Sequence, residues 1–135
     1  MNELVPPDGI VSKRSPFSVD ETVSRLTEAM EAAGAKVFAV IDQSAEARKV
    51  GLSLRDTQLV MFGNPSGGTP IMAAAPLAAL DLPLKILVSA DDDGKVRMTY
   101  LDRNWLASRY GLSHQQSAPL AAPAVLVAKV AANSA

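Results

Sequence analysis

The chain has 135 residues, a formal net charge of −1 and a hydrophobic fraction of 48%. This length fits one domain with a conventional core. The charge is near zero and evenly spread, so the sequence carries no electrostatic signature for nucleic acid or an anionic membrane surface. The absence of cysteine excludes disulfides, thiolate catalysis and thiolate metal sites.

The N-terminal segment, residues 1–9, has neither a basic start nor an apolar core, so it does not read as a secretory signal. We expect it to be a loosely held lead, with residues 10–135 forming a single domain. The most apolar tail, residues 118–132, is too short for a membrane span and carries two prolines and a lysine. We therefore expect a cytoplasmic protein that binds neither nucleic acid nor membranes.

The first half of the chain alternates strand and helix signals. Residues 10–14 are rich in β-branched side chains and predict a strand. Ser18 and Glu21 form a capping box for a helix that Gly34 ends. Residues 36–41 predict a strand buried on both faces, and strand, helix and strand in succession predict a right-handed crossover between two parallel strands. The apolar stripe of the helix is expected to be Val19, Val23, Leu26 and Met30.

A short helix at residues 42–51 and a central strand at 57–62 are expected next. The turn that follows, Phe-Gly-Asn-Pro-Ser-Gly-Gly-Thr-Pro at residues 62–70, leads into an alanine-rich helix. We expect Thr69 to cap this helix and Pro70 to occupy its first position, where a missing amide costs nothing. Pro76 either kinks or restarts it before Leu80.

The second half predicts a hairpin, with strands at residues 84–89 and 95–100 around an Asp/Gly turn. Short helices are expected at residues 104–111 and 117–131. The inner stripe of the last helix is expected to be Leu120, Ala124, Val127 and Ala131. Together these elements predict a single α+β domain, a mixed sheet of about five strands with helices mainly on one face.

The glycine-rich turn is the first candidate binding site. Flexible glycines and a helix start can present unpaired amides to an anion. No Gly-Lys-Ser/Thr follows, so the turn is not a P-loop, and ordinary turn chemistry also explains three glycines. The candidate ligand-binding residues of the turn are Gly63, Asn64, Gly67, Gly68 and Thr69.

Three polar residues outside the turn complete the candidate site. Asp42, between a strand and a helix, is either an N-cap or a general base. Gln43 lies beside it, and Lys85 either pairs with Asp42, holds an anion or points outward. No metal or cofactor is expected, because the acidic run at residues 91–93 lacks calcium-loop spacing and His114 is a lone loop histidine.

Several short segments together resemble the domain-of-unknown-function family numbered 302 over residues 10–111. They are Phe-Ala-Val-Ile-Asp at 38–42, Arg-Asp-Thr at 55–57, Phe-Gly-Asn-Pro at 62–65, Gly-Thr at 68–69, Asp-Leu-Pro-Leu-Lys-Ile at 81–86, the turn at 91–94 and Tyr100. The resemblance implies a bacterial or archaeal α+β domain that self-associates and has no established role. Family members commonly carry Asp-His where this chain has Asp42-Gln43, and glutamine neither titrates near neutral pH nor binds metals well.

Three functions stay open at this point. The first is a non-enzymatic small-ligand or regulatory binding domain that takes a small anionic ligand at the turn. The second is an enzyme with Asp42 as base and with Lys85 or the turn amides stabilising an anion. The third is a structural homodimer that packs through the alanine-rich helix at residues 69–80.

Overall fold

The computed structural model describes residues 6–132 and contains one five-stranded sheet in the order β1-β5-β4-β3-β2. Every neighbouring pair of strands is antiparallel. The strands are β1 (Ile10–Ser15), β2 (Lys36–Asp42), β3 (Thr57–Gly63), β4 (Leu84–Ala90) and β5 (Val96–Leu101). The helices are α1 (Val19–Ala32), α2 (Gln43–Lys49), α3 (Pro65–Ala74), α4 (Arg103–Tyr110) and α5 (Ala122–Ala132), with 3₁₀ turns η1 (Pro76–Asp81) and η2 (Ala118–Ala121).

The α+β class, the single domain and the five strands are confirmed, but the sheet is antiparallel where a mixed sheet was expected. β1 and β2 run in the same direction, yet they occupy opposite edges of the sheet with β5, β4 and β3 between them. Helix α1 therefore crosses the whole sheet instead of returning the chain beside β1. Local sequence signals predict the strands correctly but carry no information on this long-range order.

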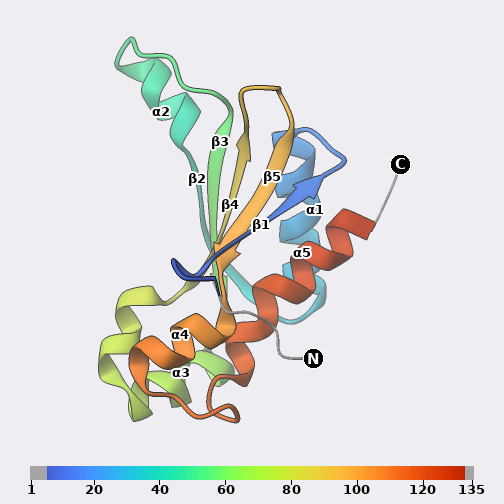
Figure 1. The fold of residues 1–135 in the computed structure, drawn as a ribbon. Helices are drawn as coiled ribbons and strands as arrows, with labels where there is room; N and C mark the ends of the chain where they lie inside the picture. Colours follow the sequence, from blue (N-terminus) through green and yellow to red (C-terminus); the bar gives the residue numbers. More distant parts are fainter. Residues whose placement is uncertain (1–5, 133–135) are drawn as a thin grey trace.

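Helices α1 and α5 cover one face of the sheet, and α2 extends beyond its far end (Figure 1). The expected stripe of α1 is confirmed, because Val19, Val23, Leu26 and Met30 are all buried. Two polar contacts tie α1 to the strands beneath it. The Ser15 and Thr22 hydroxyls are 2.6 Å apart, and Gln58 Nε2 donates to Asp20 Oδ1 at 2.7 Å.

The β4–β5 hairpin is confirmed, with Val88 opposite Met98 and the turn closed by Asp91. Leu84, Ile86 and Val88 share the buried face with Val96 and Met98, as the alternation predicts. The opposite face is less covered, and its side chains, Leu59, Met61 and Leu87 among them, are half-buried. Helices therefore pack mainly on one face.

Strand β2 corrects the expectation of a strand buried on both faces. It lies at the edge of the sheet, and Phe38 and Val40 are 46% and 44% exposed. A continuous apolar run is typical of a central strand, so the pattern at residues 36–41 is misleading unless something covers this edge.

Two helix starts also differ from expectation. Helix α3 begins at Pro65 with Asn64 as its cap, so Thr69 and Pro70 lie inside it. Helix α5 begins only at Ala122, after η2, and this shift in phase exposes Ala124. The buried side chains of α5 are Pro123, Leu126, Val127 and Val130.

Of the expected N-terminal lead, residues 1–5 lie outside the described part of the chain. The remainder forms a turn in which the amide of Gly9 donates to the carbonyl of Pro6 at 2.9 Å. The amide of Asp102, at the start of α4, donates to the carbonyl of Gly9 at 2.7 Å. This part of the lead is thus hydrogen-bonded to the body of the domain.

Candidate functional site

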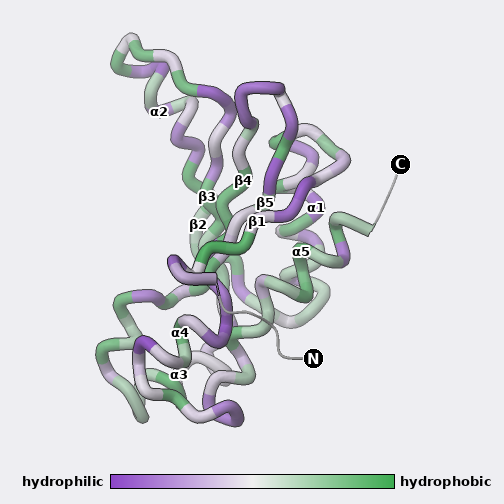
Figure 2. Tube along the Cα trace, in the orientation of Figure 1, coloured by the Kyte–Doolittle hydropathy of each residue, from purple (hydrophilic) through white to green (hydrophobic). Residues whose placement is uncertain are grey.

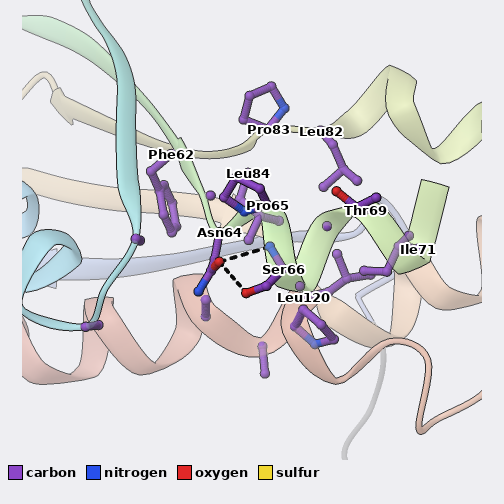
Figure 3. A pocket seen from close by; sticks show the side chains of 18 of the residues that line it. Phe62, Asn64, Pro65, Ser66, Thr69, Ile71, Leu82, Pro83, Leu84 and Leu120 are labelled. Atoms are coloured by element: carbon purple, nitrogen blue, oxygen red, sulfur yellow. Dashed lines mark hydrogen bonds between the residues drawn. The ribbon is translucent and has the colours of Figure 1, made fainter. Parts of the chain in front are cut away.

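The joint between β3 and α3 is built around Asn64. Its side-chain oxygen accepts hydrogen bonds from the amide of Ser66 at 3.1 Å and from the Ser66 hydroxyl at 2.7 Å (Figure 3). Pro65 occupies the first helical position and has no amide to satisfy. Asn64 and Pro65 thus start α3 directly after the central strand β3.

The amides of the two glycines in this turn form hydrogen bonds within the first turn of α3. The amides of Gly67 and Gly68 each donate to the carbonyl of Asn64 at 2.9 Å. Because these amides are already bonded, they do not form the open anion cradle that the sequence suggested. Gly67 has a packing role as well, since a β-carbon there would lie 3.1 Å from Cβ of Pro119.

A cavity of about 740 Å³ opens beside this joint. Its walls come from the end of β3, from α3, from the segment between η1 and β4, and from η2 and the start of α5 (Figure 3). This volume falls within the range of ligand pockets in proteins. The large apolar lining residues are Phe38, Phe62, Ile71, Met72, Leu82, Pro83, Leu84, Leu120, Val125 and Leu126.

The polar content of the cavity is small. Asn64, Ser66 and Thr69 are the polar side chains in its lining, and no charged side chain of the described residues lines it. Asn64 and Ser66 are bonded to each other, whereas the Thr69 hydroxyl has no hydrogen-bond partner within residues 6–132. The cavity is thus an apolar niche with one available hydroxyl.

Asp42 lies at the opposite end of β2 from the cavity and caps α2. Its Oδ1 accepts from the amide of Ala45 at 2.9 Å and from the Ser44 hydroxyl at 2.7 Å. The Ala45 amide, together with the Ser44 hydroxyl, holds the pKa of Asp42 below its ordinary value. A carboxylate in this state is a weak base at neutral pH. Gln43, the first residue of α2, is exposed beside it.

Lys85 lies opposite Met61 in the β3–β4 ladder, on the less covered face of the sheet. It lines a smaller hollow of about 220 Å³, together with Asp81 and Thr99. Within residues 6–132 the side chain of Lys85 forms no hydrogen bond or ion pair. The Asp81 carboxylate accepts a hydrogen bond from the Tyr110 hydroxyl, and Arg109 Nε lies 3.4 Å from it.

The structure thus divides the expected site. Gly63, Asn64, Gly67, Gly68 and Thr69 line the cavity, whereas Asp42, Gln43 and Lys85 do not line it. Sequence reasoning missed the apolar walls at residues 82–84 and 118–126, because apolar residues that line a pocket look the same in sequence as core residues. Across the described residues, no three His, Asp or Glu side chains are grouped to hold a metal ion.

The fold and the cavity together define a small α+β domain with an apolar niche at a strand–helix joint. The chain belongs to the family described as Domain of unknown function DUF302, whose model matches residues 11–127. A similar fold occurs in the crystal structure of the uncharacterized conserved protein DUF302 from Bacillus stearothermophilus. The two share 16% sequence identity with a TM-score of 0.78, over 90% of this chain and 98% of that one.

The chain is also similar to part of two longer proteins. It is 40% identical over 104 residues to the fluoride-specific ion channel FluC 1 of Brucella suis biovar 1, covering 77% of this chain and 41% of that protein. The fluoride-specific ion channel FluC 2 of Brucella melitensis biotype 1 matches equally well over 38% of its length. The chain therefore spans about two fifths of these relatives. No helix within residues 6–132 is long and apolar enough to cross a membrane.

Proposed function

We propose that this domain binds a small, largely apolar ligand in the cavity beside the β3–α3 joint and acts as a non-enzymatic, regulatory binding domain. The carrying observation is the cavity itself, which is large enough for a ligand and is lined by apolar side chains with a single available hydroxyl at Thr69. The lining favours an apolar ligand over the small anion that the glycine-rich turn suggested.

The enzyme alternative has less support. It needs Asp42 as a base near Lys85 or near free turn amides. Asp42 has a lowered pKa and caps α2, while Lys85 lies on the other side of β3. The turn amides are bonded within α3. These three groups lie in separate parts of the fold, so we do not assign a reaction.

The probes for ligand binding are straight-chain aliphatic alcohols from hexanol to dodecanol, which match an apolar pocket without a charged group. Binding to the native state raises its melting temperature. Because each buried methylene adds about 0.8 kcal/mol, affinity should rise about fourfold per added carbon until the cavity is filled. Inorganic phosphate and sulfate should produce no shift in the same assay.

Two variants of the same helix provide the matched comparison. Ala122 lines the cavity, and Ala128 is exposed on α5 away from it. Ala122→Phe should obstruct part of the cavity and strongly reduce the alcohol-induced shift, whereas Ala128→Phe should keep it. Equal shifts in both variants, or no shift with any alcohol in the unmodified protein, would contradict the proposal.

The similarity to two ion channels supports a second proposal, that this domain regulates a fluoride channel. The matched part of those relatives is about two fifths of their length, and the corresponding residues described here include no membrane-spanning helix. A regulatory domain attached to a channel would account both for the partial match and for the lack of a membrane-spanning helix in the described residues. A cytoplasmic location and self-association are further parts of the proposal.

Growth in sodium fluoride tests the regulatory role. Cells that lack this chain should show altered fluoride tolerance, which the unmodified chain restores and Ala122→Phe does not. Unchanged tolerance after deletion would remove the channel connection while leaving ligand binding intact.

A further inference from the structure

The two edge strands of the sheet are built differently. β1 carries Lys13 and Arg14, and charged side chains are a common protection against pairing with another sheet. β2 reads Lys-Val-Phe-Ala-Val-Ile-Asp, with five apolar residues in succession and no proline. Its one irregularity is a bulge between Val37 and Ala39 in its pairing with β3. No strand of the described residues pairs with its other side.

Exposed apolar side chains occur on β2 and in the connection that follows α2. Of the nine large apolar side chains that are exposed among the described residues, five fall between residues 38 and 54. They are Phe38, Val40, Val50, Leu52 and Leu54. Apolar colouring follows β2 and recurs beyond α2, whereas the second half of β1 is hydrophilic (Figure 2). An exposed apolar edge presents unpaired backbone groups with which a strand of another chain can pair.

We propose that the β2 edge is the interface through which two copies of this chain pair, antiparallel, into one continuous sheet. The ends of the strand favour a second copy as the partner. β2 begins with Lys36 and ends with Asp42, so antiparallel pairing about a two-fold axis near Ala39 brings each Lys36 beside the partner's Asp42. Lys36 has no carboxylate partner within the described chain and lies 5.1 Å from the Phe38 ring centroid.

This pairing would also place the end of the partner's β2 and its α2 near the cavity. Lys36 lies opposite Gly63 in the β2–β3 ladder, at the end of the sheet where the cavity opens. The partner's Asp42 would therefore lie two strand spacings, about 10 Å, from Gly63. The partner's α2 would begin one residue later, opposite Ala35, which is itself part of the cavity wall. This last step rests on the proposed ligand-binding function, whereas the pairing of the strands does not.

The first test is the mass of the full chain in solution. Light scattering at micromolar concentration should give twice the 14.2 kDa of one chain. Val40→Lys places a charge in the interface and should give a monomer with an unchanged circular dichroism spectrum. Ser12→Lys places the same charge on β1, the other edge, and should remain a dimer. A monomeric unmodified chain would overturn the proposal, and alcohol binding by that monomer would leave the proposed function standing.

Cross-linking locates the interface without relying on a destabilising change. Because the chain has no cysteine, each single-cysteine variant carries one thiol. Ala39→Cys should form a disulfide-linked dimer under mild oxidation, and Ser12→Cys should not. A dimer that cross-links through Leu77→Cys and not through Ala39→Cys would place the interface on the alanine-rich segment and overturn the pairing through β2.

Discussion

Gly9 holds the first strand against helix α4. Its φ angle is +74°, and a β-carbon at this position would lie 2.4 Å from Cδ2 of Trp105. Its carbonyl also accepts the amide of Asp102, the cap of α4. A glycine is required here for two independent reasons, the positive φ and the contact with the indole ring.

Gly9→Ala should lower the free energy of unfolding by about 3 kcal/mol, because it adds a steric clash to the cost of left-handed backbone. Gly34→Ala is the matched control. Its φ is +82°, but nothing lies within 4 Å of the added β-carbon, so it should cost only about 1 kcal/mol. Urea unfolding followed by the fluorescence of Trp105, the single tryptophan, measures both. Equal losses in the two variants would show that contact with Trp105 contributes nothing.

An aspartate caps helix α2, and another aspartate accepts hydrogen bonds from the amides of the β4–β5 turn. Asp42 caps α2, and Asp91 Oδ1 accepts from the amides of Lys95 at 2.9 Å and Asp93 at 3.0 Å. The Ala45 amide lowers the pKa of Asp42, and the Lys95 amide lowers that of Asp91. Each element is therefore held together more strongly when its aspartate is ionised.

The two lowered pKa values set the direction of a pH dependence. Above the ordinary value of 3.8 both carboxylates are ionised in the folded and the unfolded chain, and their stabilisation is complete. As the pH falls through the folded-state values, this stabilisation is lost. The free energy of unfolding should therefore decrease below about pH 4.

Asp42→Asn keeps a capping oxygen and removes the titrating carboxyl group. The free energy of unfolding of this variant should therefore decrease less between pH 4 and pH 3 than that of the unmodified chain. Urea titrations at pH 6, 4 and 3 compare it with Asp91→Asn, and the double variant should be flatter than either. An unchanged slope in Asp42→Asn would contradict the assignment.

The elements themselves show what a sequence can and cannot specify. Helix α1 is predicted correctly because its capping box, apolar stripe and terminal glycine all agree. The start of helix α3 is predicted five residues too late, because Asn64-Pro65 and Thr69-Pro70 both satisfy the same cap-and-proline pattern. Choosing between them depends on where β3 ends and on the packing of Gly67 against Pro119, neither of which is a local signal.

For the whole molecule, sequence patterns predict five strands and their facing residues but not their order. Order depends on pairing between residues far apart in the chain, such as Ile10 with Leu101. The candidate site is only half predictable for a similar reason. Its turn residues can be recognised in the sequence by their glycines and prolines. Its apolar walls at residues 82–84 and 118–126 come together only in the folded chain.

The origin of the cavity walls has a consequence during synthesis of the protein. One wall is α3, in the middle of the chain, and the other contains Leu120 and Leu126, close to its last described residue. When α3 first leaves the ribosome, it faces no opposite wall. The cavity can form only after α5 has emerged and packed, so a ligand can be captured only once translation has passed α5.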